Sequence, residues 1–206
     1  MPSSRRWPAE VSGLEQPVSD PHLRERPLAG RLVHQGSFLE VREDEVRLPD
    51  GGTASREYVV HPGAVAIVPL LDDGRLVLER QYRHPVGRVL LEFPAGKIDA
   101  GESTLLCAQR ELLEETGYGG GEWARAGLIH VAPAYSTEII EIWFARNLHA
   151  GAQCLDAGEF IELCLLTEAE LEQQAARGEI TDVKTLIGLM WLQKWRAGLL
   201  PLSWQG

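Results

Sequence analysis

The stretch GKIDAGESTLLCAQRELLEETGY, from Gly96 to Tyr118, is bounded by glycines and rich in glutamate. Residues 103–116 contain neither proline nor glycine and carry apolar side chains at helical spacing, which predicts a helix. On that helix Glu111, Glu114 and Glu115 fall within one arc of about 100°, since side chains three and four residues apart share a face. The side chains predicted to pack against a sheet are Leu105, Ala108 and Leu112.

The acidic face of this helix predicts a metal site. Carboxylates at such spacing repel one another, and more strongly where they are partly buried. Arg110 stands one turn before Glu114, where it can orient a carboxylate, and the preceding Pro94–Gly96 loop brings backbone carbonyls close. Carboxylate and carbonyl oxygens are the ligands that Mg²⁺ takes in proteins. The alternative is an acidic face that only meets solvent, which is the usual fate of a charge run on a helix.

The same stretch matches the pattern G-x5-E-x7-R-E-U-x-E-E-x-G-U, where U is a bulky aliphatic residue. The matching residues are Gly96, Glu102, Arg110, Glu111, Leu112, Glu114, Glu115 and Gly117, while Tyr118 replaces the last aliphatic residue. In this pattern, and over about residues 60–165, the chain resembles the Nudix hydrolase family. The resemblance implies an α/β fold, the Nudix α/β/α sandwich with a mixed sheet. It also implies an enzyme that hydrolyses a nucleoside diphosphate linked to a second group.

The resemblance further implies which residues hold Mg²⁺, or Mn²⁺ in its place. The main ligands would be the carbonyl of Ala95 and the carboxylates of Glu111 and Glu115. Glu114 and Glu102 would assist, with Arg110 holding the carboxylates in place. A cation held there would bridge the diphosphate, neutralise its charge and lower the pKa of the attacking water.

Segments outside this stretch resemble the ADP-ribose and nucleotide-sugar pyrophosphatase branch of the family. They are SREYVVHPGAVAIVPL, ERQYRHPVGRVLLEFPAGK and the late GEITDVKTLIGLMWL, so the likeness extends over about residues 30–197. Pro133 follows Gly117 by 16 residues, a spacing that in the family accompanies hydrolysis of ADP-ribose. The branch therefore implies cleavage of ADP-ribose to AMP and ribose 5-phosphate. Another nucleotide-sugar, such as GDP-mannose, is the rival substrate.

Five residues are candidates for contact with the substrate. By position, Arg56 and Arg83 correspond to arginines that contact substrate in the branch, and a cationic fork suits a diphosphate. Pro133 and Glu138 lie in a segment that resembles the loop facing the terminal ribose, and Glu92 is a candidate polar contact.

The catalytic base is expected in the acidic segment before the last core strand. Relatives of this branch often carry two acids one residue apart there. Glu159 matches the second acid, but Ala157 replaces the first. Glu159 is therefore the candidate for both base and metal ligand. The alternatives are that Asp156 is the base or that the base lies elsewhere in the chain.

Composition narrows the class of protein. The chain has 206 residues, a net charge of −10 and a pI of about 5.1, so its surface repels nucleic acids and anionic membranes. No apolar run reaches the roughly 18 residues that span a bilayer, and the first residues lack the apolar core of a secretory signal. The three cysteines form neither a disulfide framework nor a zinc motif, which favours a reduced, cytoplasmic location.

Three segments are predicted along the chain. Residues 1–28 are rich in proline, serine and arginine and predict a flexible arm. Residues 29–61 predict a small antiparallel β unit, and residues 62–200 the Nudix hydrolase domain. A unit of this size needs something to pack on, and in the branch it crosses to a second copy, so a homodimer is implied. A less favoured alternative is a non-catalytic regulatory module that kept the fold.

Overall fold

The computed structural model describes residues 20–206, so most of the arm predicted over residues 1–28 lies outside the described part. The described chain divides into two compact units. The N-terminal unit contains the described residues up to Pro62 together with Ala132–Glu138. The main unit contains Gly63–Val131 and Ile139–Gly206.

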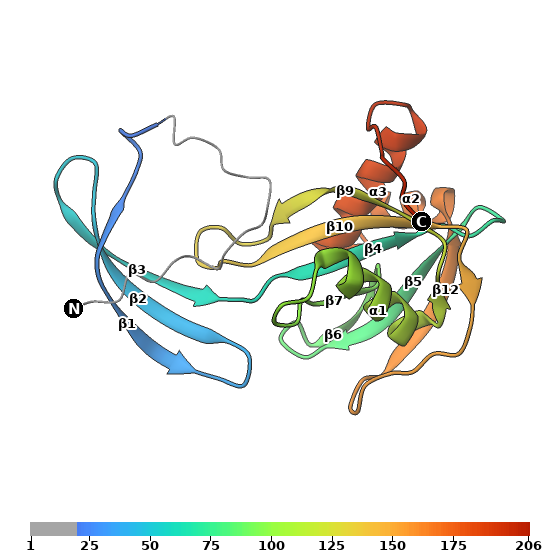
Figure 1. The fold of residues 1–206 in the computed structure, drawn as a ribbon, viewed down its shortest axis with the longest axis horizontal. Coiled ribbons are helices and arrows are strands. Elements are labelled where there is room, and N and C mark those ends of the chain that lie inside the picture. The colour runs from blue at the N-terminus through green and yellow to red at the C-terminus, as the bar shows by residue number, and fades with distance from the viewer. Residues whose placement is uncertain (1–19) are drawn as a thin grey trace. The chain divides into compact units, whose positions relative to one another are not determined.

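The N-terminal unit is a three-stranded antiparallel sheet with the strand order β1-β2-β3 (Figure 1). Its strands are β1 (Arg26–Gln35), β2 (Glu40–Arg47) and β3 (Thr53–Val60). The turn between β2 and β3 follows the predicted Asp50-Gly51-Gly52 sequence. Gly51 has a φ of 91°, and the Asp50 side chain accepts a hydrogen bond from the Gly52 N–H at 2.9 Å.

The first strand begins earlier than the sequence pattern predicts. The apolar pattern of a strand can be read only from Leu32, and residues up to 28 were assigned to the flexible arm. In the structure β1 already includes Arg26–Leu28. Every residue of β1 is exposed, so the strand has no buried face and therefore no alternation of apolar and polar residues to reveal it.

The main unit is built on two sheets. The first has the order β7-β4-β10-β9 and comprises β4 (Ala64–Pro69), β7 (Ala95–Lys97), β9 (Glu122–His130) and β10 (Ile139–Arg146). The second has the order β12-β5-β6 and comprises β5 (Arg75–Arg83), β6 (Arg88–Glu92) and β12 (Ile161–Thr167). A short ladder pairs β8 (Tyr118–Gly119) with β11 (His149–Ala150). Strands β4 and β10 run parallel and their other neighbours antiparallel, so the first sheet is mixed, as predicted.

Helices cover both faces of the mixed sheet. The helices are α1 (Thr104–Thr116), α2 (Glu168–Ala176) and α3 (Val183–Arg196). Alternate residues of β4 serve the two faces: Val65 belongs to the core cluster with Leu112 of α1, and Val68 to the cluster with Leu189 of α3. Figure 1 shows α1 on one side of these strands and α2 with α3 on the other. The predicted α/β/α sandwich is confirmed.

Capping residues mark the ends of α1 and the start of α2. Ser103 caps α1 by accepting a hydrogen bond from the Leu106 N–H, and Gly117 ends the helix with a φ of 75°. Thr167 and Glu170 form a capping box at the start of α2. No helix within residues 20–206 is long and apolar enough to cross a membrane.

Candidate metal and diphosphate site

The short strand β7 brings the backbone of Ala95 and Gly96 against the acidic face of α1. The Ala95 N–H donates a hydrogen bond to Glu115 Oε2 at 3.1 Å. The Glu111 carboxylate lies directly over Gly96, where a Cβ would come within 1.9 Å of Glu111 Cδ. Only glycine leaves room for this approach, so the first glycine of the motif shapes a cradle of oxygens around the helix face.

Arg110 gathers three of the motif carboxylates. Its guanidinium donates to both oxygens of Glu102 at 2.9 Å, to Glu111 at 2.8 Å and to Glu114 at 3.2 Å. It also donates to the Lys97 carbonyl at 3.3 Å, which ties α1 to β7. Through these charge-assisted hydrogen bonds Arg110 draws the three carboxylates together.

The carboxylates of α1 carry more negative charge than the protein balances. Burial raises the pKa of Glu115 far above its ordinary value, and the nearby charges of Glu79 and Glu111 raise it further. Burial also raises the pKa of Glu111, against the opposing effect of Arg110. A divalent cation would reverse both effects, and this set of oxygen atoms suits Mg²⁺. Within residues 20–206, no three acidic, histidine or cysteine side chains stand in a ligating arrangement. Arg110 donates hydrogen bonds to carboxylate oxygens of Glu102 and Glu111.

Glu159 is carried towards these carboxylates by a loop that is tied to the end of α1. The Cys154 N–H donates to the Glu114 carbonyl at 2.9 Å, and the Gln153 amide donates to the Glu115 carbonyl. Burial is the largest cause of the raised pKa of Glu111 and of Glu115, and the charge of Glu159 raises both pKa values further.

Arg83 and Glu92, predicted as separate substrate contacts, bind each other. Arg83 Nε and Nη2 donate to the two Glu92 oxygens at 2.9 and 2.8 Å. Glu92 is 1 % exposed and also bonds the Lys184 ammonium, whereas the Arg83 side chain is 37 % exposed. Glu92 is thus placed to orient Arg83 rather than to reach a ligand, and Arg83 keeps exposed surface for one.

Two buried charged residues near this pair were not predicted from the sequence. Glu79 lies opposite Glu92 on β5, and Lys184 lies in the first turn of α3. One signal could have revealed Glu79. Glu79 directly follows the apolar run Leu76–Leu78 and lies two residues after the buried Val77. Because side chains two residues apart in a strand point to the same face, the sequence predicts that Glu79 also points inward. Lys184 gave no such signal, because a single lysine near a helix start usually faces solvent.

The remaining predicted contacts belong to the N-terminal unit. Arg56 pairs with Glu25 and is exposed, and Pro133 is exposed in the segment 132–138. Glu138 Oε1 lies 3.9 Å from His61 Nε2. The segment is held by β3, because the Val59 N–H donates to the Tyr135 carbonyl at 2.9 Å and the Val59 carbonyl accepts from the Thr137 N–H at 3.0 Å.

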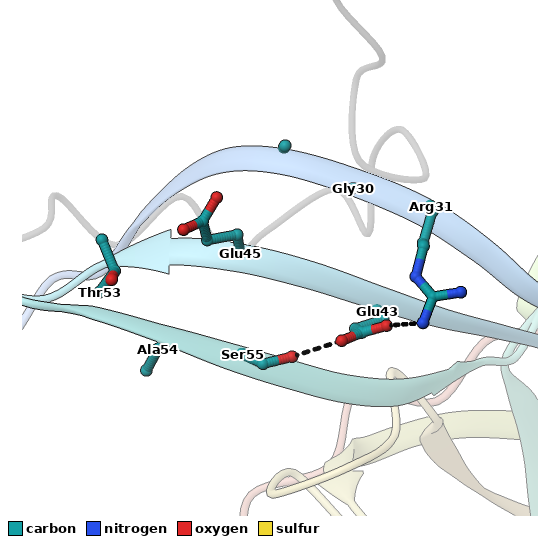
Figure 2. Close-up of a pocket in the computed structure, with 8 residues that line it drawn as sticks. Gly30, Arg31, Glu43, Glu45, Thr53, Ala54 and Ser55 are labelled. Atoms are coloured by element: carbon teal, nitrogen blue, oxygen red, sulfur yellow. Dashed lines mark hydrogen bonds and ion pairs between the residues drawn. The ribbon is translucent and has the colours of Figure 1, made fainter.

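A shallow hollow also lies over the sheet of the N-terminal unit (Figure 2). At its edge Arg31 pairs with Glu43, which accepts a hydrogen bond from Ser55 at 3.0 Å. The arginine is therefore neutralised by a neighbour. The residues that line the hollow are Ala29, Gly30, Arg31, Glu43, Glu45, Thr53, Ala54 and Ser55. This lining has no group suited to activate a diphosphate.

Comparison with known families identifies the class. Residues 60–186 match the NUDIX domain, and residues 25–59 match the nucleoside diphosphate sugar hydrolase N-terminal domain. The chain therefore belongs to the Nudix family and is a Nudix hydrolase, as the motif at 96–118 predicted.

Relatives and solved structures agree with this assignment. An ADP-ribose pyrophosphatase of Bacillus subtilis is 32% identical over 83% of this chain and 94% of its own length. A methanol dehydrogenase activator of Bacillus methanolicus is 36% identical over the same shares. A crystal structure of an ADP compounds hydrolase superposes with a TM-score of 0.77 at 25% identity, covering 85% of this chain and 95% of the other. These similarities support hydrolysis of an ADP compound or nucleotide-sugar.

Proposed function

We propose that the protein is a Mg²⁺-dependent ADP-ribose diphosphatase that forms AMP and ribose 5-phosphate. The observation that carries the proposal is the arrangement of the motif carboxylates. Arg110 gathers Glu102, Glu111 and Glu114, and the Ala95 N–H at β7 donates to Glu115. The similarity to an ADP-ribose pyrophosphatase and to an ADP compounds hydrolase supports the substrate. Water attacks one phosphorus and gives up a proton, the bond from that phosphorus to the bridging oxygen breaks, and the bridging oxygen leaves with the other phosphate.

The side chains divide the work of this reaction. The proposed metal-holding groups are the Ala95 carbonyl, Glu111, Glu115, Glu114, Glu102 and Glu159. Bound there, Mg²⁺ or Mn²⁺ supplies charge neutralisation of the diphosphate and a lowered pKa of the attacking water. Arg110 keeps the carboxylates in place. The hydrogen bonds to Glu92 fix the orientation of Arg83, and the exposed edge of its guanidinium is free to bind a phosphate.

Glu159 is the proposed acceptor of the water proton. It shares the electrostatic environment of Glu111 and Glu115, and its loop is tied to α1. Its carboxylate also accepts a hydrogen bond from the Asp156 N–H at 3.3 Å, and Asp156 is the alternative base. A pH–rate profile of Glu159→Gln and Asp156→Asn separates the two, because only loss of the true base removes the acidic limb of the profile.

The distal part of the substrate is assigned to the N-terminal unit. Arg56, Pro133 and Glu138 are the proposed contacts there. Arg56 must release Glu25 to bind a phosphate or ribose oxygen, and this exchange is feasible because the pair is exposed.

A panel of substrates tests the proposal. Purified protein with Mg²⁺ is incubated with ADP-ribose, GDP-mannose, UDP-glucose, NADH and diadenosine polyphosphates, and the products are separated by chromatography. ADP-ribose should give the highest kcat/KM. A clear preference for GDP-mannose would contradict the assignment of ADP-ribose as the substrate. Inactivity on every compound would favour a non-catalytic regulatory module. Glu115→Gln should fold normally and lose most of the activity.

We further propose a homodimer joined through the N-terminal unit. All of β1 is exposed, and it presents the apolar side chains of Leu28, Leu32 and Val33. A three-stranded sheet of this kind gains stability when a partner covers it. A reduced, cytoplasmic location is also part of the proposal, since Cys107, Cys154 and Cys164 are all unpaired.

A further inference from the structure

Glu79 is a fully buried carboxylate to which the structure gives no hydrogen-bond donor. It lies in β5 between β6 and β12, opposite Glu92 and Leu163, and its exposed fraction is 0%. Both of its carboxylate oxygens are buried without a hydrogen-bond partner. Leaving such a group unpaired is costly, so a buried carboxylate of this kind indicates a partner of positive charge.

The neighbouring cations of the protein are bound elsewhere. Lys184 contacts Glu92 and lies 3.1 Å from Asp182, and Arg83 uses two N–H groups on Glu92. Both cations act on Glu79 only through space. Their two positive charges are matched by Glu92 and Asp182, which leaves Glu79 and Glu115 without a counter-charge from these two cations.

The side chain that meets Glu79 is Glu115. Glu115, from α1, is 4% exposed, and its carboxylate lies within hydrogen-bonding contact of the Glu79 carboxylate. Two acidic groups facing each other in a buried place need either a shared proton or a shared cation.

The orphan atoms near this pair are oxygens. Gln81 Oε1 is also buried without a partner, and it lies two residues from Glu79 on the same face of β5. Carboxylate and amide oxygens without donors are the groups that Mg²⁺ and Mn²⁺ accept as ligands. A water molecule could donate hydrogen bonds to only some of these unpaired oxygens. The oxygens of Glu79 and Gln81 therefore fit a divalent cation better than a water molecule.

We propose that Glu79 supplies, from β5, an additional carboxylate for a divalent cation shared with Glu115. This inference rests on the proposed function for the metal held by Glu115, and it adds a residue that lies outside the family motif. Glu79 then contributes to metal affinity directly and is more than a counter-charge for Lys184.

Binding of Mn²⁺ alone tests the assignment. The dissociation constant is measured from the paramagnetic resonance signal of free Mn²⁺, and the rise in thermal unfolding temperature on adding Mn²⁺ is recorded. Glu79→Gln keeps the shape of the side chain and should weaken Mn²⁺ binding by about 10-fold or more. In metal-free buffer the same variant should unfold at the wild-type temperature or above, since a buried unpaired charge is removed. Glu162→Gln, on the exposed pair with Arg80, is the matched control and should bind like wild type.

The outcomes separate this inference from the proposed function. If Glu79→Gln binds Mn²⁺ as tightly as wild type, the inference is overturned while hydrolysis of ADP-ribose stands. If the wild type hydrolyses none of the nucleotides but Glu79→Gln still weakens Mn²⁺ binding, the metal assignment stands and the function falls. Should Glu79→Gln not fold, Glu79→Asp keeps the charge with a shorter reach. Weaker Mn²⁺ binding by that variant supports the assignment, and wild-type affinity contradicts it.

Discussion

The carboxylate of Glu111 occupies the space in which a side chain at position 96 would begin. The motif therefore needs glycine at position 96 because a larger residue would take the space of the Glu111 carboxylate. The backbone at Gly96 does not have a positive φ, so the requirement concerns space rather than chain conformation. A change at Gly96 should accordingly disturb the site without disturbing the fold.

We predict that Gly96→Ala folds but loses most of its activity. The new Cβ would lie 1.9 Å from Glu111 Cδ, so the carboxylate must swing away from the other ligands. We expect roughly a 100-fold loss of kcat, measured with ADP-ribose, because displacements of about 1 Å at a site have this effect. Gly119→Ala is the control, since its Cβ would meet only a Leu113 methyl group at 3.2 Å. Equal activity of the two variants would contradict the role of Gly96.

The pairing of Arg83 with Glu92 has a consequence for stability. Burial alone raises the pKa of Glu92, but hydrogen bonds from Arg83 and the charge of Lys184 outweigh it, so the net pKa is lowered. The stabilisation is therefore complete above the pKa of the unfolded chain, about 4.3, and is lost as the pH falls through the folded-state value.

We predict that Glu92→Gln costs about 3 kcal/mol of unfolding free energy near neutral pH. The difference from wild type should shrink below about pH 4, because protonation then removes the same charge from the wild type. Urea unfolding at a series of pH values measures it. Glu162→Gln, which breaks an exposed pair, should cost under about 1 kcal/mol throughout. A Glu92→Gln cost that is the same in acid and at neutral pH would show that Glu92 is not stabilised by its charge.

Much of the residue-scale site could be predicted from the sequence, because its members are neighbours on one helix. Glu111, Glu114 and Glu115 are brought together by helical spacing alone, and Arg110 by its position one turn away. The partnership of Arg83 with Glu92 depends on the register of a hairpin, which the sequence did not define. Glu79 escaped prediction because a single charge in a strand usually faces solvent.

At the scale of elements, the strongly amphipathic segments could be predicted to within a few residues. The helix predicted over 103–116 is α1, which spans Thr104–Thr116. The weak point was β1, whose ten residues are all exposed. A strand with one buried face has alternating apolar and polar residues in its sequence. A strand without a buried face lacks this alternation and is therefore hard to predict from the sequence.

The loop before β12 is the element on which the proposed base depends. We predict that Gln153→Ala lowers kcat by roughly 10-fold, since the loss of its bond to the Glu115 carbonyl loosens the position of Glu159. The unfolding free energy should fall by only about 1 kcal/mol. Steady-state kinetics and urea unfolding give the two numbers. Gln173→Ala, at an exposed position of α2, should change neither. A wild-type kcat for Gln153→Ala would show that the hydrogen bond from Gln153 to the Glu115 carbonyl has no part in catalysis.

At the scale of the whole molecule, the exposed apolar face of β1 determines the expected assembly. We predict that Leu32→Glu converts a dimer into monomers, because it places a charge on a surface that a partner should cover. Light scattering coupled to size-exclusion chromatography measures the mass. Leu199→Glu alters an equally apolar, exposed residue of the main unit and should leave the mass unchanged. A wild-type mass for Leu32→Glu would place the interface elsewhere.

Two family matches meet between residues 59 and 60, which invites the exchange of N-terminal modules between relatives to alter substrate choice. The segment 132–138 stands in the way of such grafting. It is encoded within the second match, yet Val59 holds it through backbone hydrogen bonds to Tyr135 and Thr137, and the His61 N–H donates to the Thr137 side chain. A chimera cut at residue 60 would present this segment to a foreign strand. Successful exchange requires the transfer of both pieces, so they should be inherited together through the history of the family.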